Sequence, residues 1–340
     1  MYLGIEIGGT KLQLGVGRAD GKLAALERFA VEPKSGAQGI LKQIEAAARV
    51  LIARYNVRGI GIGFGGPVDS SKGVVIKSHH VDGWEGFPIV DWCHDSLRLP
   101  ARLQNDCDVA ALAEATLGAG RKSRVVFYVT VGTGIGGGLV VDRRIYSGSG
   151  HGAAEIGHLR PGLHAENSDQ TVESLASGWG IAAAAQARLS DPISHAFVSL
   201  TSGLDRHRPE EMRQRLIETE EAEEEYAADL WDRCDGKLDH LTSVMVAQAA
   251  VDGNEIAREV LARACQALGW GIAQAITLMS PEIVVVGGGV SLMDESLFLA
   301  PVREAVARYV FPPLADTYRI VPAELGEEVV VHGALAVAAG

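Results

Sequence analysis

The stretch IEIGGTKLQLGVGRADGKL, residues 5–23, follows the same plan as VTVGTGIGGGLVVDRRIYSG, residues 129–148. Each stretch has a strand-like run, a glycine-threonine turn, a second strand-like run, a polar turn and a third run. A plan that recurs along one chain indicates a repeated structural unit. The two stretches therefore predict two similar lobes, each built around a three-stranded meander.

Helical patterns and further strand-like runs complete the expected lobes. Apolar residues recur at helical spacing over 40–55 and 256–279, so both segments are expected to be helices that cover a sheet. The strand-like runs 57–64 and 283–286 each end in glycines, which is typical of a strand that leads into a tight turn. The fold class that we predict is α/β.

The length of 340 residues favours two lobes around a cleft over one compact domain. We predict an N-terminal α/β lobe at residues 1–118 and a C-terminal α/β lobe at 119–325, with a helical insertion at about 190–240. A C-terminal helix at about 326–340 is expected to pack back on the first lobe. The acidic segment around 209–235 favours a solvated helix or lid over a site.

The composition is that of an ordinary globular protein and narrows the possible functions. The 31 basic and 43 acidic side chains give a net charge of −12, which disfavours nucleic acid as a partner. The four cysteines form no CxxC pair, which indicates a reducing compartment without a disulfide framework. No signal-like or bilayer-spanning apolar run is present in the sequence, so we expect a cytoplasmic protein with no membrane partner.

Three glycine-rich turns follow strand-like runs and are candidates for phosphate binding. Backbone N–H groups at glycine can approach phosphate oxygens without a Cβ in the way, and a threonine hydroxyl adds a donor. A dinucleotide fingerprint is excluded because a strand, not a helix, follows Gly137, and no Walker-type loop exists. The candidate residues are Gly8, Gly9, Thr10, Lys11, Gly132, Thr133, Gly134, Gly287, Gly288 and Gly289.

Asn105 and Asp106 stand at a predicted strand end and helix start. Simple helix capping is one explanation, because Asn and Asp are preferred N-caps. The other is that the Asp106 carboxylate accepts a proton from a substrate hydroxyl that attacks phosphorus. Glu155 and His158, three residues apart, could face one ligand, and Glu173 is either a further ligand or an ordinary exposed glutamate.

Six ordered motifs resemble the ROK family of sugar kinases and repressors over almost the whole chain. They are GIEIGGTK at 4–11, FGGPVD at 64–69, NDCDVAALAE at 105–114, GTGIGGGLV at 132–140, AAEIGH at 153–158 and VVVGGGV at 284–290. The resemblance implies a two-lobed actin-like, ribonuclease H-like ATPase fold with the cleft between the lobes. It also implies Asp106 as catalytic base, a nucleotide on the glycine turns, and a sugar against Gly66, Asn105, Asp106, Glu155, His158 and Glu173.

The chain departs from the family pattern at three places. The cysteines that usually hold a zinc ion after the GH pair are missing, so we predict no structural zinc. Glu6 replaces the commoner aspartate and retains a carboxylate that could contact Mg²⁺ through water. Asp108 replaces a commoner asparagine.

The resemblance implies a kinase that transfers phosphate from ATP, with Mg²⁺, to a hexose, with glucose to glucose 6-phosphate as the leading reaction. Fructose, mannose, N-acetylmannosamine or another amino sugar remain open as acceptors, and polyphosphate remains open as donor. The alternative outside the kinases is a sugar-binding regulator, here without a DNA-binding domain. A homodimer is expected from the resemblance, with the helices near Trp179 or Trp231 as candidate contacts.

Overall fold

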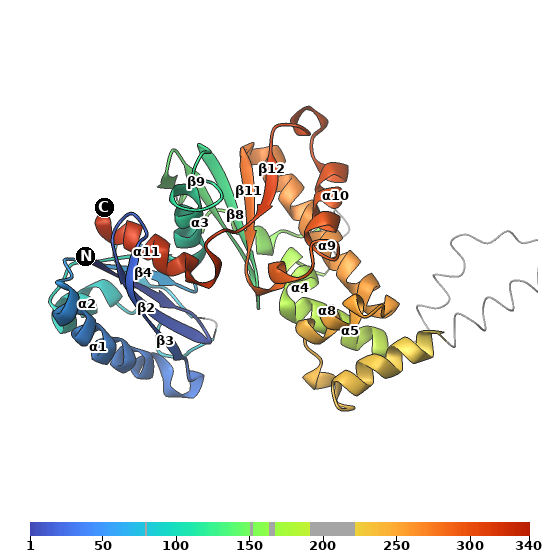
Figure 1. Ribbon diagram of the computed structural model, residues 1–340, viewed down its shortest axis with the longest axis horizontal. Helices are drawn as coiled ribbons and strands as arrows, with labels where there is room; N and C mark the ends of the chain where they lie inside the picture. The colour runs from blue at the N-terminus through green and yellow to red at the C-terminus, as the bar shows by residue number, and fades with distance from the viewer. Residues whose placement is uncertain (79, 150–151, 163–166, 191–221) are drawn as a thin grey trace, which may run out of the picture.

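The computed structural model describes residues 1–78, 80–149, 152–162, 167–190 and 222–340. In these residues two five-stranded mixed sheets form two lobes side by side, coloured blue and green to red in Figure 1. None of the described helices is both long and apolar enough to cross a membrane.

The first sheet has the order β3-β2-β1-β4-β7. The strands β1, β2 and β3 pair antiparallel, and β1, β4 and β7 pair parallel. Their bounds are β1 Tyr2–Ile7, β2 Lys11–Gly17, β3 Leu23–Ala30, β4 Ile60–Phe64 and β7 Ala101–Asn105, beside a small ribbon of β5 Val68–Asp69 and β6 Val74–Val75. The predicted meander is confirmed, and β4 begins three residues later than the strand-like run predicts.

The second sheet repeats this layout with the order β10-β9-β8-β11-β12. Again three strands pair antiparallel and the last two are added in parallel. The bounds are β8 Val125–Val131, β9 Ile135–Val141, β10 Arg144–Ile145, β11 Ile283–Gly287 and β12 Arg319–Pro322. The repeat seen in the sequence is therefore a repeat of topology, and the two-lobed actin-like α/β fold is confirmed.

Helices cover both sheets. The first lobe carries α1 Gly36–Tyr55 and α2 Ile89–Leu97. The second carries α4 Val172–Ala176, α5 Gly178–Ser190, α8 Ser243–Val251, α9 Glu255–Met279 and α10 Leu299–Tyr309. Short 3₁₀ turns are η1 Pro33–Ser35, η2 Ile156–His158, η3 Leu238–His240, η4 Gly289–Leu292, η5 Pro312–Leu314 and η6 Gly326–Glu328.

Two further helices, α3 Asp106–Thr116 and α11 Val329–Ala339, lie between the sheets (Figure 1). α11 packs on β1 and β4, whereas α3 packs on β8 and β9, and the two helices also pack on each other. A Cβ on Gly61 would collide with the backbone oxygen of Ala334, and a Cβ on Gly333 would collide with that of Val109. Glycine is therefore required where these elements approach most closely. The domain boundary at residue 118 stays a prediction.

The acidic segment is described only from residue 222 on, and residues 191–221 lie outside the described residues. Residues 222–233 are helical. Leu230 and Cys234 are fully buried there, and Glu223 pairs with the buried Arg188 at 3.0 Å. This part of the segment is a helix that packs one face against the core of the second lobe and leaves Glu224, Glu225 and Asp232 exposed to solvent.

Candidate active site

The turn from β7 into α3 places two polar side chains between the lobes. Asn105 is the N-cap of α3, and its Oδ1 accepts the N–H groups of Cys107 (2.8 Å) and Asp108 (3.3 Å). Its Nδ2 donates to the backbone oxygen of Gly66 at 3.1 Å. The capping explanation is therefore confirmed for Asn105, and this leaves the neighbouring Asp106 carboxylate outside the capping role.

The Asp106 carboxyl group has a higher pKa in the folded protein than in water. Burial, helped by the negative charge of Glu6, raises the pKa of Asp106 to about 6, although the N–H of Cys107 donates to Oδ1 at 2.9 Å and opposes the shift. A carboxylate with a pKa near neutrality is suited to accept a proton during a reaction.

A second carboxyl group with a raised pKa, that of Asp108, lies two residues further along, within the first turn of α3. Burial, followed by the charges of Glu155 and Asp106, raises the pKa of Asp108 to about 7. Its Oδ1 is buried and has no hydrogen-bond partner among the described residues. The negative charge of Glu155 lies close enough to raise the pKa of both Cys107 and Asp108. This interaction connects Glu155 to the α3 terminus.

Glu6 on β1 is held in a buried polar network. Its Oε1 pairs with Lys11 Nζ at 3.1 Å, and its Oε2 accepts a hydrogen bond of 2.6 Å from Gln13 Nε2. Gln13 is fully buried, donates also to the backbone oxygen of Glu327 (3.0 Å), and accepts from Arg28 Nε (3.0 Å). Burial is the main reason that the pKa of Glu6 is raised. The positive charge of Lys11 lowers this pKa and so opposes the effect of burial. The network fixes the carboxylate in one orientation.

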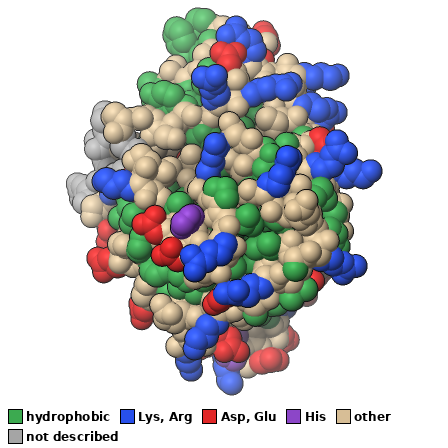
Figure 2. Space-filling model, turned by 90° about the vertical axis from the view of Figure 1, so that its left-hand side faces the viewer, with side chains coloured by type: hydrophobic (Ala, Val, Ile, Leu, Met, Phe, Trp, Pro, Cys, Tyr) green, Lys and Arg blue, Asp and Glu red, His purple; other side chains and the backbone are tan. Residues whose placement is uncertain are grey.

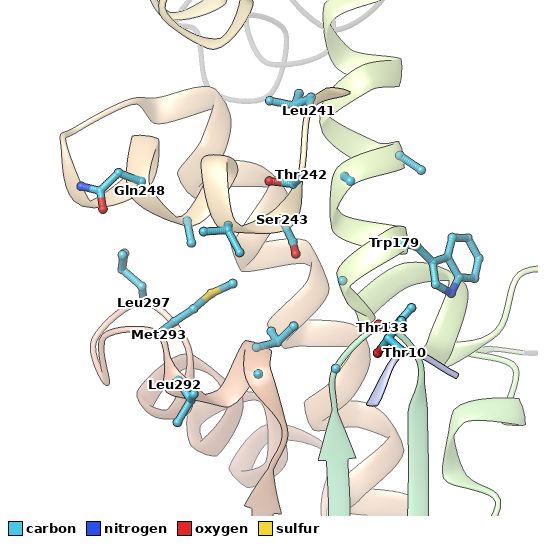
Figure 3. Close-up of a pocket in the computed structure, with 18 of the residues that line it drawn as sticks. Thr10, Thr133, Trp179, Leu241, Thr242, Ser243, Gln248, Leu292, Met293 and Leu297 are labelled. Carbon is cyan, nitrogen blue, oxygen red and sulfur yellow. The ribbon is translucent and has the colours of Figure 1, made fainter. Parts of the chain in front are cut away.

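The two glycine-threonine turns, at Thr10 in the first lobe and Thr133 in the second, open on one cavity of about 1140 Å³. Glu6 and Asp106 also line this cavity. Thr10 and Thr133, one from each turn, are drawn at the same end of this cavity in Figure 3. The other predicted turn residues along it are Gly8, Lys11, Gly132 and Gly289. A Cβ on Gly132 or Gly289 would meet nothing within 4 Å, so the absence of side chains leaves this space open.

The remaining turn residues lie elsewhere. Gly9 is covered by the ring of His80, and Gly134 faces the carboxylate of Glu173. Gly287 and Gly288, together with Gly289, line an adjacent cavity of about 390 Å³ that reaches Glu6 and Asp106 from the side of β12. The three glycine turns thus surround the two carboxylates from both lobes.

Three of the predicted sugar ligands, Glu155, His158 and Glu173, lie on the second lobe around η2 and α4. Glu155 and His158 are exposed at the two ends of η2, where the N–H of His158 donates to the backbone oxygen of Glu155 at 3.1 Å. Glu173 is half-buried, and its Oε2 accepts the N–H of Ile135 at 2.8 Å. The reading of Glu173 as an ordinary exposed side chain is therefore wrong, because it holds the β8–β9 turn.

The apolar lining of the large cavity was not predicted from sequence. Of the eight large hydrophobic side chains exposed in the described chain, four line it: Trp179, Val244, Val251 and Leu292. Figure 3 shows Trp179 beside Thr10 and Thr133, at the end of the cavity that holds the phosphate turns, and Leu292 on the opposite side, with Thr242 and Ser243 at the start of α8. No local pattern marked these residues, since an exposed apolar side chain shows itself as unusual only once burial is known.

The helices near Trp179 and Trp231 stay predicted candidates for dimer contacts. Trp179 is 47% exposed and also lines the cavity, and Trp231 is partly buried against the core of the second lobe. In the described part of the chain, no group of three or more His, Cys, Asp or Glu side chains is arranged to hold a metal ion.

Comparisons with known proteins agree with this geometry. The model of the ROK family matches residues 2–340. A glucokinase of Halalkalibacterium halodurans is 28% identical over 98% of this chain and 93% of its own length, and one of Thermotoga maritima is 26% identical over 98% and 96%. The crystal structure of a ROK family glucokinase from Streptomyces griseus, in complex with glucose and AMPPNP, has 29% identity, a TM-score of 0.77 and 99% coverage of both chains. This chain belongs to the ROK family.

Proposed function

We propose that this protein is a sugar kinase that transfers the γ-phosphoryl group of ATP to a hexose, with glucose as the leading substrate and glucose 6-phosphate as the product. The observation that carries the proposal is the position of Asp106. Its carboxylate, with a pKa raised to about 6, lines the same cavity as the phosphate turns of both lobes. The glucokinases to which the chain is similar over nearly its full length support the choice of substrate.

In this proposal Asp106 is the general base. It takes the proton from the attacking hydroxyl, which in the proposed reaction is the 6-hydroxyl of the hexose. Backbone N–H groups of the turns at Gly8–Lys11 and Gly132–Gly134 hold the phosphates. Gly66, Asn105, Glu155, His158 and Glu173 bind the sugar. One oxygen of Glu173 already accepts the N–H of Ile135, so its other oxygen is the one that can reach a sugar hydroxyl.

Mg²⁺ fits the acidic side of the cavity. Glu6 and Asp106 both line it, and the charge of Glu6 is one cause of the raised pKa of Asp106. Glu6 would hold the ion through water, because both of its oxygens are already bonded to Lys11 and Gln13. A bound Mg²⁺ would neutralise charge on the nucleotide phosphates. We propose no structural zinc, since the family's cysteine cluster is missing from the sequence.

The apolar end of the cavity suits the adenine base. Val244, Val251 and Leu292 present exposed apolar surface there, and Thr242 and Ser243 add hydroxyl groups that can recognise ring nitrogens. A polyphosphate donor would gain nothing from an apolar surface, because it has no base to bury. This contrast favours ATP as the donor.

The direct test is a coupled assay of the purified protein with Mg-ATP, and separately with polyphosphate, against glucose, fructose, mannose, glucosamine, N-acetylglucosamine and N-acetylmannosamine. We expect sugar-dependent turnover with glucose and ATP. Turnover with another sugar alone would change the substrate and keep the kinase. Silence across the panel, in folded protein that binds nucleotide by calorimetry, would replace the kinase with a sugar-binding regulator.

We further propose a homodimer that does not bind nucleic acid. The net charge of −12 supports the second statement, because the phosphate backbone repels an acidic surface. Light scattering at several protein concentrations checks the first. A mass of one chain at all concentrations would contradict it.

A further inference from the structure

A second cavity, of about 850 Å³, lies away from the candidate active site and shares none of its lining residues. The first lobe contributes the turn between β5 and β6 and the edge strand β7. The second lobe contributes β10, and the last turn of α11 closes the cavity beside the C-terminus that Figure 1 labels. We call this cavity the hinge groove, because it spans both lobes and the ends of α3 and α11.

The hinge groove is positively charged. Its lining includes four basic side chains, Lys72, Arg102, Arg143 and Arg144, and no Asp or Glu side chain among the described residues. Figure 2, which views the first lobe from its outer side, shows Lys and Arg over much of the upper half of that face. A cluster of this kind is unusual on a chain whose net charge is −12.

The groups around these cations leave much of their charge available. Lys72 pairs with Asp69 at 2.9 Å, and Gly340, with its carboxylate, lies beside Arg102. Asp142 pairs instead with Arg124, which lies outside the groove lining. Within the described residues, Arg144 forms no ion pair.

The arginines make only long backbone hydrogen bonds. Arg102 Nη1 donates to the backbone oxygen of Val337 at 3.4 Å, and Arg143 Nη2 donates to that of Arg121 at 3.4 Å. A guanidinium group has five N–H donors, so most of them remain for a ligand.

The neutral polar groups of the groove point to the same ligand chemistry. Ser70 Oγ donates to Gln104 Oε1 at 2.8 Å, which leaves the Gln104 amide N–H groups as donors. Guanidinium and amide donors match phosphate oxygens, and arginine does so with two parallel hydrogen bonds. A volume of about 850 Å³ is larger than one phosphate requires and falls within the usual range for small-molecule sites.

We propose that the hinge groove binds a small anion that carries two or more phosphate groups, with Arg102 of the first lobe and Arg144 of the second lobe holding its two ends. Such a ligand offsets the repulsion between cations that the two lobes contribute to one cavity. It is a site distinct from the nucleotide cavity and does not depend on the proposed kinase activity.

The test uses calorimetric titration with tripolyphosphate in a background that blocks the nucleotide cavity. Gly132→Leu obstructs the phosphate turn of that cavity, because Gly132 lines it and nothing within 4 Å of a Cβ there prevents the side chain from occupying the space. We expect this variant still to bind tripolyphosphate. Adding Arg102→Gln and Arg144→Gln should weaken binding at least tenfold, on the basis of about 1.5–3 kcal/mol for a hydrogen bond to a charged group.

Arg308→Gln, an exposed arginine on α10 outside the groove, is the matched control and should leave binding unchanged. Parallel titrations with fructose 1,6-bisphosphate and glucose 6-phosphate distinguish a sugar bisphosphate from an inorganic chain. Loss of all tripolyphosphate binding in Gly132→Leu would overturn the proposal, as would equal affinity with and without the two groove arginines. Unchanged thermal unfolding of the groove variant confirms that its fold is intact.

Discussion

The hairpins β1–β2 and β8–β9 have the same topology and turn chemistry, yet they serve the candidate active site differently. The first hairpin carries buried polar groups, since Glu6 and Gln13 lie on it and bond to each other. The second carries glycines: a Cβ on Gly136 would collide with Cys107 Sγ, and one on Gly138 would lie 2.6 Å from the Cys107 backbone oxygen. The first hairpin therefore supplies charge to the site, and its glycines Gly4 and Gly15 make room for α11, whereas the glycines of the second hairpin make room for the start of α3.

This difference explains how Asp106 comes to lie between the two phosphate turns. Asp106 follows a strand of the first lobe, but its helix packs on the second sheet. The approach is possible only because β9 has no side chains at the contact. The repeated supersecondary unit thus supplies two phosphate turns. The different residues of the two hairpins allow one reactive group, Asp106, to lie between these turns.

The largest expected effect comes from the residue that both hairpins surround. Asp106→Asn should lower kcat by roughly 10²–10⁴-fold, the usual contribution of a general base, because an amide cannot accept the proton. Sugar affinity should change little, since the amide retains hydrogen bonding. Steady-state kinetics and calorimetry with glucose measure the two effects. Turnover close to that of the unmodified protein would remove Asp106 as the base.

Glycine substitutions in the second hairpin test whether it supplies room. Gly138→Ala should lower the free energy of unfolding by about 1–3 kcal/mol and reduce kcat, because the new methyl group displaces Cys107 and with it Asp106. Gly132→Ala, at the turn of the same hairpin, meets no atom within 4 Å and is the control for stability. Urea unfolding measures both variants. Equal stability of the two would refute the close contact at Gly138.

A substitution in the first hairpin tests whether it supplies oriented charge. Gln13→Leu removes the donor to Glu6 and leaves a buried carboxylate with fewer partners, at a cost of about 1–3 kcal/mol in the free energy of unfolding. If Glu6 acts on Mg²⁺, the same change should raise the Mg²⁺ concentration needed for half-maximal turnover. Gln13→Glu is not a suitable control, because it adds a charge, whereas Gln13→Asn keeps an amide and should lose less.

The smallest expected effect concerns how the stability contributed by Asp108 depends on pH. Asp108 has a pKa of about 7 in the folded protein against 3.8 as its ordinary value. Between these values the folded state binds more protons than the unfolded state, so the stability contributed by this group falls as pH rises through the window. Above pH 7 the loss of stability from ionising Asp108 in the folded protein has reached its full size.

Asp108→Asn removes this cost, and we expect the variant to be more stable than the unmodified protein by on the order of 1 kcal/mol at pH 8, after allowance for solvent screening. At pH 4, where the carboxyl group is protonated in the folded protein, the two should be nearly equal. Chemical unfolding at both pH values measures the difference. A destabilised variant at pH 8 would show that the charged form makes favourable contacts in the fold.

The catalytic efficiency, kcat/KM, should also depend on pH and should fall at low pH. The pKa of Asp106 is about 6, and the base must be deprotonated to accept a proton, so kcat/KM should fall tenfold per pH unit below about pH 6. The profile of Asp108→Asn provides the comparison, because it keeps the base and removes one neighbouring charge.

Local patterns were sufficient for the elements and for part of the site. Alternation and glycine turns identified the two hairpins, helical periodicity identified α1 and α9, and the polar pair at 105–106 identified the start of α3. These signals are local, because the pleat, the helix turn and the N-cap each involve neighbouring residues only. The motif order then indicated the ROK family.

Tertiary structure decided the rest, because distant contacts leave no local pattern. The contact of Glu173 with Ile135, the burial of Leu230 and the apolar end of the cavity at Leu292 depend on segments far apart in the chain. The sequence by itself determined the repeated elements and the residue types at their turns. Only the packing of α3 on the glycines of β9 decided that Asp106, with its raised pKa, lies between the two phosphate turns.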